Sequence, residues 1–205
     1  TKSGLLEGAS RAVEDVTFIP DWGKERMEIM LKDRPDWCIS RQRDWGIPIT
    51  LLYEKDTGEL HSEQNEIFVK ASEAIKDSGI DSWANLDLGI DEEGYEKSKD
   101  IFDVWFDSGI THYCVVDELF GSNTQSDLYL EGSDQHRGWF QSSLLTSIAM
   151  KGTAPYKSVL THGFVVDDSG RKMSKSLGNI VTPQEVIKDS GADILRYWIA
   201  STDFR

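Results

Sequence analysis

The chain has 205 residues and carries 36 aspartate and glutamate residues against 22 lysine and arginine residues, which gives a formal net charge of −14. Hydrophobic residues make up 39% of the chain and charged residues 28%, a composition that excludes a disordered or fibrous protein. The acidic balance argues against a protein that wraps nucleic acid over its whole surface. A local basic patch that contacts a phosphate remains compatible with it.

The two cysteines and the short apolar runs argue against a zinc protein, a disulfide-stabilised protein and a membrane-spanning protein. Cys38 and Cys114 lie far apart, with no CxxC pair and no paired histidines beside them, so the sequence predicts neither a zinc site nor a disulfide framework. No apolar run approaches the roughly 18 residues that a membrane span needs, and no signal-peptide core follows Thr1. We therefore expect a cytoplasmic protein with reduced thiols and no membrane partner. Because the chain starts without Met and ends at Arg205 within a continuing pattern, we expect a piece of a longer protein.

The first two predicted elements are a helix over residues 22–32 and a strand over residues 47–53. Apolar residues recur at helical spacing over residues 22–32, with Asp21 as the expected N-cap and Pro35 as the expected stop. After a polar stretch, residues 47–53 are rich in β-branched and aromatic side chains and predict a strand.

Residues 51–100 are predicted to form a small, separate unit. Residues 56–58, with the sequence Asp-Thr-Gly, predict a turn. Residues 63–94 are acidic and mildly amphipathic, and their apolar side chains predict one face of a helix. The residues of this helical stripe are Ile67, Ala71, Ala74 and Ile75. We interpret the stretch as an inserted module that carries no recognisable chemistry.

From residue 101 onward, three short apolar runs are predicted to be buried strands, and each leads into a polar loop that contains glycine. These runs cover residues 102–106, 128–131 and 159–162. After the second run, a short loop leads into a predicted helix. The apolar residues of this helix are Trp139, Phe140, Leu144, Leu145 and Ile148. The order strand, loop, helix and strand predicts an α/β fold with a parallel sheet, whose ligands bind beyond the carboxyl ends of the strands.

This topology gathers six polar residues around one expected crevice. They are Ser108, Glu131, Asp134, Gln135, His136 and His162. Farther along the chain, residues 182–185 (Thr-Pro-Gln-Glu) form a capping box with proline at the first helical position. The helix that starts there is predicted to break at Gly191, and a second helical run follows.

The loop formed by residues 170–179 carries three cations within five positions, interleaved with serines and flanked by glycines. Such a loop is able to fold around a polyphosphate, although a generic loop of this composition is more often a solvated basic turn. The pentapeptide Lys172-Met173-Ser174-Lys175-Ser176 resembles the KMSKS signature of the class I aminoacyl-tRNA synthetases. The resemblance implies that Lys172 and Lys175 are catalytic, because these lysines stabilise charge on the triphosphate in that family.

Four further stretches carry the same resemblance in the family's order. His162-Gly163 resembles the segment that contacts adenine, and the other stretches are residues 37–46, 103–109 and 129–140. Together with the signature loop they resemble the isoleucyl-tRNA synthetases of the bacterial type. The resemblance implies a ligase that activates isoleucine with ATP to isoleucyl-adenylate and transfers it to tRNA(Ile). It also implies Mg²⁺ as a cofactor and a monomeric parent enzyme.

The resemblance also assigns the binding residues. Contacts with ATP and the adenylate are expected from Glu131, Gly132, Asp134, Gln135, His162, Gly163 and Lys175. Trp105 and Trp139 are expected to flank the isoleucine side chain, although tryptophan is more often an ordinary core residue. Arg41 and Arg43 either contact the acceptor end of the tRNA or brace the catalytic domain, and the structural role is the safer expectation. No metal site, zinc included, is expected in this segment.

One signature of the family is absent from the sequence. A His-Ile-Gly-His segment does not occur, and none of the four histidines pairs with another at that spacing. These histidines are His61, His112, His136 and His162. We therefore expect only the second half of a Rossmann-like catalytic domain, and we expect the isolated piece to be inactive. Editing and full tRNA selection are expected to lie outside the chain.

The expected organisation has three parts. Residues 1–50 begin the catalytic segment that follows the editing insertion, residues 51–100 form a small inserted α+β module, and residues 101–205 form the second half of the nucleotide-binding domain, signature loop included. Two alternatives stay open at this point. One is a valyl or related branched-chain synthetase of the same class, and the other is an adenine-nucleotide-binding module without catalysis.

Overall fold

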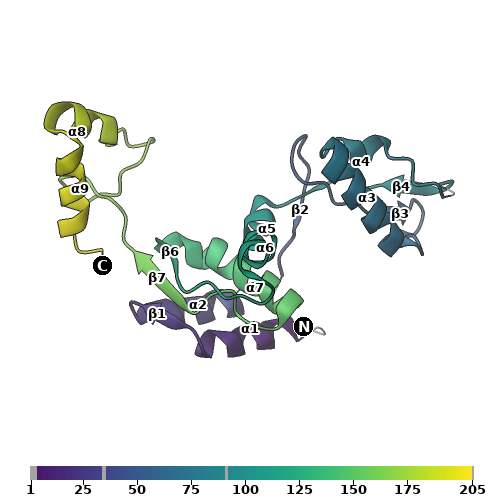
Figure 1. Cartoon of the computed structure of the whole chain (residues 1–205), viewed down its shortest axis with the longest axis horizontal. Helices are drawn as coiled ribbons and strands as arrows, with labels where there is room; N and C mark the ends of the chain where they lie inside the picture. Colours follow the sequence, from purple (N-terminus) through teal and green to yellow (C-terminus); the bar gives the residue numbers. More distant parts are fainter. Residues whose placement is uncertain (1–3, 34–35, 91, 205) are drawn as a thin grey trace.

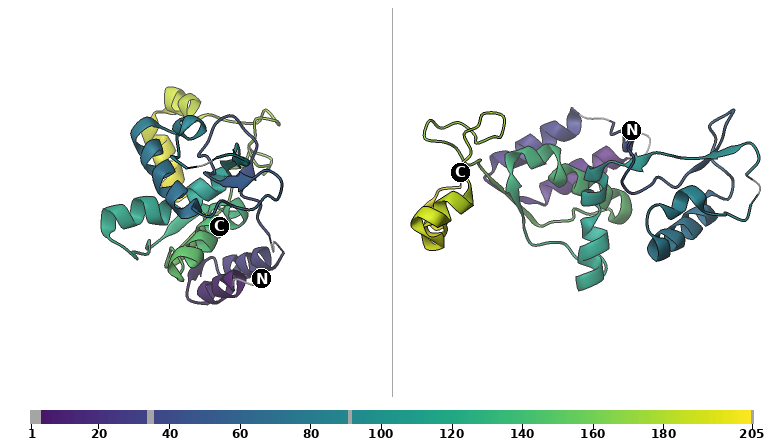
Figure 2. Two further views of the ribbon diagram at one scale, coloured as in Figure 1. Left: turned by 90° about the vertical axis from the view of Figure 1, so that its right-hand side faces the viewer. Right: turned by 90° about the horizontal axis from the view of Figure 1, so that it is seen from above.

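A computed structural model describes residues 4–33, 36–90 and 92–204 of the chain. A central body lies between a small module and a C-terminal pair of helices (Figure 1). Seen from above, the module and the C-terminal pair lie at opposite ends of the body (Figure 2). Within the described ranges, every helix is too short or too polar to cross a membrane.

The central body contains a three-stranded parallel sheet, which confirms the predicted α/β fold. Its strands are β1 (Thr17–Ile19), β6 (Tyr129–Gly132) and β7 (Ser158–His162), in the order β1-β7-β6. The register aligns Phe18 of β1 and Tyr129 of β6 with Val159 of the central strand. Strands β6 and β7 confirm two of the predicted strands, whereas β1 was not predicted. A strand of three residues is too short for an alternating pattern to become visible in the sequence.

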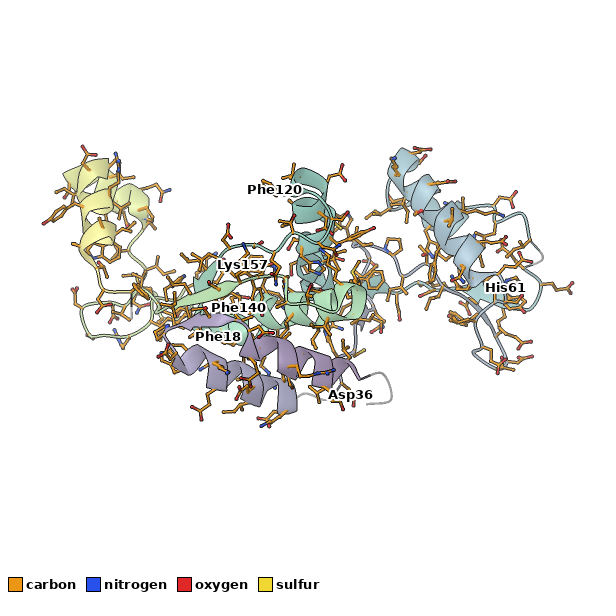
Figure 3. All side chains as sticks on the ribbon, turned by 60° about the horizontal axis from the view of Figure 1, so that its bottom comes forward. Phe18, Asp36, His61, Phe120, Phe140 and Lys157 are labelled. Carbon is orange, nitrogen blue, oxygen red and sulfur yellow. The ribbon has the colours of Figure 1, made fainter. Side chains whose placement is uncertain are left out.

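Three helices supply most of the core beside this sheet. They are α1 (Leu5–Glu14), α2 (Trp22–Lys32) and α7 (Trp139–Lys151), and α1 packs on both of the others. The core residues are Ala9, Val13, Val16, Phe18, Met27, Leu31, Tyr129, Phe140, Leu144, Ala154, Tyr156 and Val159. Phe18 and Phe140 lie together in this part of the molecule (Figure 3). Both predicted helices, α2 and α7, are confirmed.

The predicted ends of α2 need one correction. Asp21 makes no side-chain capping hydrogen bond, because its own backbone is already helical (φ −57°, ψ −30°) rather than extended. The first turn is closed by backbone bonds instead, from Gly23 N to Pro20 O at 3.0 Å and from Lys24 N to Asp21 O at 3.1 Å. The helix ends at Lys32, and Pro35, the predicted stop, lies outside the described residues.

The predicted strand over residues 102–106 is wrong. Only β5 (Ile101–Phe102) is extended, and it is followed at once by the helix α5 (Val104–Gly109). The helix begins there because Asp103 is an N-cap, whose Oδ1 accepts a hydrogen bond from Trp105 N at 2.9 Å. A short apolar run fits either a strand or a buried helix, and this cap decides for the helix. A π-helical turn, η1 (His112–Asp117), and the short α6 (Glu118–Phe120) continue the chain.

The small module has its own sheet and its own core. Strands β3 (Leu52–Glu54) and β4 (Tyr95–Lys97) are antiparallel, and α3 (Gln64–Ser78) and α4 (Ser82–Asn85) pack beside them. Its buried hydrophobic residues are Leu52, Ile67, Ala71, Trp83 and Leu88. Thus Ile67 and Ala71 of the predicted stripe are buried, whereas Ala74 and Ile75 are half-buried. The predicted turn is present, with Gly58 N donating to Glu54 O at 2.8 Å.

The strand predicted over residues 47–53 forms only in part. Its first half is irregular and forms one bridge with β5, in which Phe102 N donates to Ile47 O at 2.8 Å and Ile49 N donates to Asp100 O at 2.9 Å. Regular pairing starts at Leu52. The two-residue strand β2 (Ser40–Arg41) pairs with β5 and connects the module to the body.

The C-terminal helices are those that the sequence predicts. They are α8 (Pro183–Ser190) and α9 (Ala192–Ser201), separated by Gly191 with φ 84°. The capping box is complete: Glu185 N donates to Thr182 Oγ1 at 3.3 Å and Thr182 N donates to Glu185 Oε2 at 2.8 Å. Neither helix contains a buried residue.

Candidate functional site

The carboxyl ends of the parallel strands border a cavity of about 300 Å³. Strand β1 ends at Ile19 and β7 at His162, and the 3₁₀ helix η2 (Ser133–Arg137) begins directly after β6. The residues that line the cavity are Pro20, Trp22, Arg26, Ser133, Thr161, His162 and Gly163. Ligands of parallel α/β sheets bind at this edge. The cavity is therefore the candidate ligand site of the central body.

Two residues predicted for the site, His162 and Gly163, line this cavity. The Nδ1 atom of His162 donates to the carbonyl oxygen of Gly163 at 2.6 Å. Beside them, the side chain of Thr161 is 2% exposed, and its Oγ1 atom has no hydrogen-bond partner among the described residues. A buried hydroxyl without a partner is costly in a folded protein. The Oγ1 atom itself is not exposed to the cavity, so a ligand there would reach it only after a local rearrangement.

Gly132 occupies a position where a larger residue would displace neighbouring side chains. A Cβ atom there would lie 2.9 Å from Asp134 Oδ1 and 3.3 Å from Cε1 of Phe164. Both neighbours follow the ends of the strands β6 and β7, so glycine lets the two loops approach each other. Glu131 and Asp134 on either side of it are exposed.

Gln135, which is predicted to contact the ligand, also forms a hydrogen bond that stabilises the start of α7. Its Oε1 atom accepts a hydrogen bond from the backbone N–H of Trp139 at 2.9 Å, at the first residue of α7. This bond satisfies one of the N–H groups that the start of a helix leaves unpaired. A contact from Gln135 to a ligand would therefore use its Nε2 group.

His136, which we predicted at the crevice, is instead fully buried beneath it. Its ring lies 5.7 Å from that of Trp22 and 5.3 Å from that of Phe140, and its Nδ1 atom donates to Ser133 O at 3.1 Å. Burial lowers the pKa of His136 below its ordinary value. The residue packs α2 against α7, and it does not face the cavity. Ser108 is also absent from the lining.

The two tryptophans predicted for the amino-acid pocket lie on neighbouring helices, but they do not line one cavity. Trp139 stacks on Tyr129, with ring centroids 3.9 Å apart and an interplanar angle of 8°, and its Nε1 donates to Ser108 O at 3.0 Å. Trp105 is 42% exposed and lies next to Gly138. It lines a separate cavity of only about 30 Å³, the size of one water molecule. The residues around that cavity are Trp37, Trp105, Arg137, Gly138, Gln141, Ser142 and Leu145.

A buried carboxylate fixes the start of α5 and was missed in the sequence. Asp103 is 4% exposed, and besides capping Trp105 N its Oδ2 accepts hydrogen bonds from Trp37 Nε1 at 3.3 Å and from Nη2 of Arg41. Arg41 also donates from Nη1 to Ser40 O at 2.8 Å. Arg41 therefore braces the domain, as the structural alternative expected. The signal for this contact was the aspartate before Val-Trp, but its partners lie more than 60 positions away.

Five lining residues of the cavity were also missed, namely Pro20, Trp22, Arg26, Ser133 and Thr161. Pro20, Trp22 and Arg26 follow β1, and this strand is the signal that places them at the same edge as His162. Trp22 is 45% exposed and offers a flat aromatic face. Arg26 offers a cation to the same space.

The signature loop lies beyond β7 as one strand of a short hairpin. Val166 bridges to Lys172, and Met173 N donates to Val165 O at 3.1 Å. The Nζ atom of Lys172 lies 3.4 Å from the centroid of the Phe164 ring, which places the ammonium group on the aromatic face. Lys175 is exposed. Neither lysine forms an ion pair within the part of the chain that the structure describes.

Comparison with protein families gives one match over nearly the whole chain. The model of the tRNA synthetases class I (I, L, M and V) matches residues 2–205. The isoleucine–tRNA ligase of Acinetobacter baylyi is 59% identical over 98% of this chain, and that of Marinomonas sp. is 56% identical over 100% of it. The chain spans 22% of the length of each of these relatives.

Solved structures show the same fold at low sequence identity. The leucyl-tRNA synthetase of Agrobacterium radiobacter, in a ternary complex with tRNA and LeuAMS, has a TM-score of 0.56 at 23% identity and covers 82% of this chain and 24% of its own. The Mycobacterium tuberculosis methionyl-tRNA synthetase bound by methionyl-adenylate has a TM-score of 0.54 at 21% identity, over 96% of this chain and 30% of its own. Both are similar to this chain in fold.

Proposed function

Because the chain belongs to the class I tRNA synthetases of the I, L, M and V group, we propose that it forms part of the catalytic domain of an isoleucine–tRNA ligase. The observation that carries this proposal is the identity of 54–59% to enzymes of that name over almost the whole chain. The proposed enzyme joins isoleucine to ATP, releases pyrophosphate, and transfers the isoleucyl group from the adenylate to tRNA(Ile). It is proposed to act as a monomer in the cytoplasm.

The lysines of the signature loop would act on the leaving group. When the carboxylate of isoleucine attacks the α-phosphorus of ATP, negative charge develops on the departing pyrophosphate. Lys172 and Lys175 belong to an exposed loop that follows the carboxyl end of β7, so their ammonium groups are able to reach phosphate oxygens at that edge. Preorganised cations of this kind lower the barrier because they meet the charge where it forms.

The residues at the strand ends would hold the adenylate. His162 and Gly163 line the cavity, which suits an adenine contact through the backbone, and Gly132 allows the loops after β6 and β7 to come close. The exposed carboxylates of Glu131 and Asp134 are acceptors for ammonium or hydroxyl donors of the ligand. Gln135 would contribute its Nε2 group, since its Oε1 atom already caps α7.

Magnesium would enter with the nucleotide. Mg²⁺ at such sites takes most of its ligands from water and substrate phosphates and only one or two from carboxylates. Among the described residues no group of three or more metal-ligating side chains occurs, and the ion would be held mainly by water and the substrate phosphates. The ion would add positive charge beside the pyrophosphate.

Trp105 and Trp139 are proposed as walls of the isoleucine pocket. In the present arrangement only Trp105 lines the small cavity beside α5, and about 30 Å³ does not admit an isoleucine side chain. The proposal therefore requires the exposed indole of Trp105 to move when the amino acid binds. Asp103 limits this movement, because it fixes the backbone N–H of the same residue.

The proposed organisation follows the three parts expected from the sequence. Residues 51–100 would be an inserted module, which their separate core supports, and residues 1–50 and 101–205 would together form the second half of the catalytic domain. The other half would supply the missing phosphate-binding signature. We expect the isolated chain to be inactive for this reason.

A chimera tests this proposal. Residues 1–205 would replace the matching segment of the Acinetobacter baylyi ligase, and ATP–pyrophosphate exchange would be measured with isoleucine and with valine. We expect isoleucine-dependent exchange by the chimera and none by the isolated chain. A folded chimera without exchange would contradict the proposal, and a preference for valine would support the valyl alternative, which the relatives reported above do not favour.

A further inference from the structure

A single carboxylate organises the hairpin that carries the signature loop. Oδ1 of Asp167 accepts hydrogen bonds from the backbone N–H groups of Ser169 at 3.0 Å and Arg171 at 2.9 Å. Its Oδ2 accepts from Arg171 Nε at 3.0 Å and from Asn179 Nδ2 at 2.8 Å. Four donors therefore converge on Asp167, which precedes the KMSKS pentapeptide, and one of them comes from the residue that closes the loop.

Asn179 connects this carboxylate to the pentapeptide itself. Its Oδ1 accepts a hydrogen bond from Ser174 N at 3.0 Å, while its Nδ2, besides the bond to Asp167, lies 3.4 Å from the carbonyl oxygen of Lys172. One amide group thus contacts the backbone on both sides of Met173. Together with the bridge between Val166 and Lys172, these bonds restrain the backbone of residues 172–174.

The burial of these groups fits a positioning role. The side chain of Asp167 is 14% exposed, whereas that of its ion-pair partner Arg171 is 62% exposed. The hydrogen bonds from Asn179 and from the Arg171 backbone lower the pKa of Asp167 to about 2. The carboxylate is therefore charged at any working pH, and it accepts all four bonds at once.

We propose that Asp167 and Asn179 are positioning residues of the adenylation step, which hold the backbone of residues 172–174 so that Lys172 faces the departing pyrophosphate. This inference rests on the proposed function. The loop contains no buried side chain, so polar contacts are what restrict its conformations. A loop that is already ordered loses less conformational freedom when ATP binds.

The test uses the chimeric ligase and three single variants. In Asp167→Asn the amide Nδ2 replaces one of the acceptor oxygens, and in Asn179→Asp two carboxylates face each other. For Asp167→Asn and for Asn179→Asp we expect the KM for ATP in pyrophosphate exchange to rise about tenfold and kcat to fall about tenfold. The KM for isoleucine should stay unchanged within twofold. Asp168→Asn is the matched control, because Asp168 is an exposed neighbour of the same type, and its kinetics should be those of the parent.

A reciprocal exchange of the two residues sharpens the test. In the double variant Asp167→Asn with Asn179→Asp, the amide of residue 167 is able to donate to the carboxylate of residue 179, whose other oxygen accepts from Ser174 N. We expect kcat/KM for ATP to be at least fivefold higher than in Asn179→Asp alone. A merely structural role would not produce this recovery together with an unchanged KM for isoleucine.

Three results would overturn the inference. They are an active chimera that is indifferent to Asp167→Asn, a parallel rise in the KM values for ATP and isoleucine, and a double variant no better than Asn179→Asp. Thermal unfolding of each variant separates a loss of folding from a loss of positioning. An inactive parent chimera would instead contradict the proposed function, so the two failures are distinguishable.

Discussion

The chain on either side of His162 is stabilised in two different ways. Residues before it form two hydrophobic clusters, one in the central body and one in the small module. The described residues after it, 163–204, include no buried side chain. Hydrogen bonds of Asp167, the capping box at Thr182 and a backbone bond from Gly163 N to Phe204 O at 2.8 Å hold this region.

The difference separates stability from activity in the proposed enzyme. Burial of apolar surface dominates folding, so the body should determine whether the chain folds. Polar contacts in an exposed loop contribute little to global stability, but they set the geometry of charged groups. Changes in the body should therefore alter stability first, and changes in the loop should alter catalysis first.

The largest expected effect is a cavity in the body. Phe140→Ala should lower the free energy of unfolding by about 3–5 kcal/mol, because Phe140 is fully buried against Tyr129 and His136. Denaturant unfolding of the chain, followed by tryptophan fluorescence, measures it. Phe120→Ala is the matched control, since Phe120 is 72% exposed and lies apart from Phe140 (Figure 3). An equal loss of unfolding free energy in the two variants would contradict the view that the buried core of the body determines stability.

The next effect should appear in the reaction and leave stability unchanged. Lys175→Ala in the chimera should lower the rate of isoleucine-dependent pyrophosphate exchange about 10²–10³-fold, the usual cost of one preorganised group that meets developing charge. Its thermal unfolding should match the parent, because Lys175 is exposed. Lys188→Ala on α8, also exposed, is the control and should retain full activity. A variant that is less stable but equally active would contradict the expectation that changes in the loop alter catalysis first.

A smaller effect is expected at the start of α8. Thr182→Ala removes the hydroxyl that accepts from Glu185 N and should destabilise this helix by about 1 kcal/mol. Hydrogen exchange of the α8 amides should accelerate accordingly, while amides in α7 keep their rates. Ser190→Ala, at the other end of α8, should leave exchange unchanged. Faster exchange throughout the body would show that α8 is part of its cooperative unit.

The smallest effect concerns pH. Since the folded-state pKa of Asp167 is lowered to about 2, its contribution to loop order is complete above the ordinary aspartate pKa of about 3.9 and is lost only as the pH falls through about 2. The backbone amide signals of Ser169 and Arg171 should therefore stay fixed in NMR spectra from pH 6 to pH 3. Midpoints near pH 4 at these amides would contradict the hydrogen bonds that we describe.

Local signals predicted much of the fold. The capping box at Thr182, the helix after Gly138 and the strands β6 and β7 all have patterns that span only a few residues, and the structure confirms them. The strand predicted over residues 102–106 was wrong because these five residues suit a strand or a helix equally. The deciding contact, from Trp105 N to Asp103 Oδ1, depends on a rotamer that a residue pattern does not reveal.

The site was predicted less completely than the fold. The resemblance assigned His162, Gly163 and the loop lysines from contiguous motifs; His162 and Gly163 line the cavity at the end of β7, the lysines follow in the next loop, and the roles of all four stay predictions. The predicted strand-loop-helix topology placed His136 at the crevice, whereas its ring is packed under it, since its burial depends on α2, more than 100 residues earlier in the chain. Trp22 and Arg26 were missed for the same reason.

Hydrogen–deuterium exchange on the chimera, with and without a non-hydrolysable isoleucyl-adenylate analogue, tests the division between body and loop most directly. We expect α7 and β7 to exchange slowly in both states, and residues 163–179, which contain no buried side chain, to exchange faster than the body and to be slowed further when the analogue binds. Exchange of residues 163–179 that stays the same when the analogue binds would contradict the claim that the body determines stability while this loop acts on the ligand.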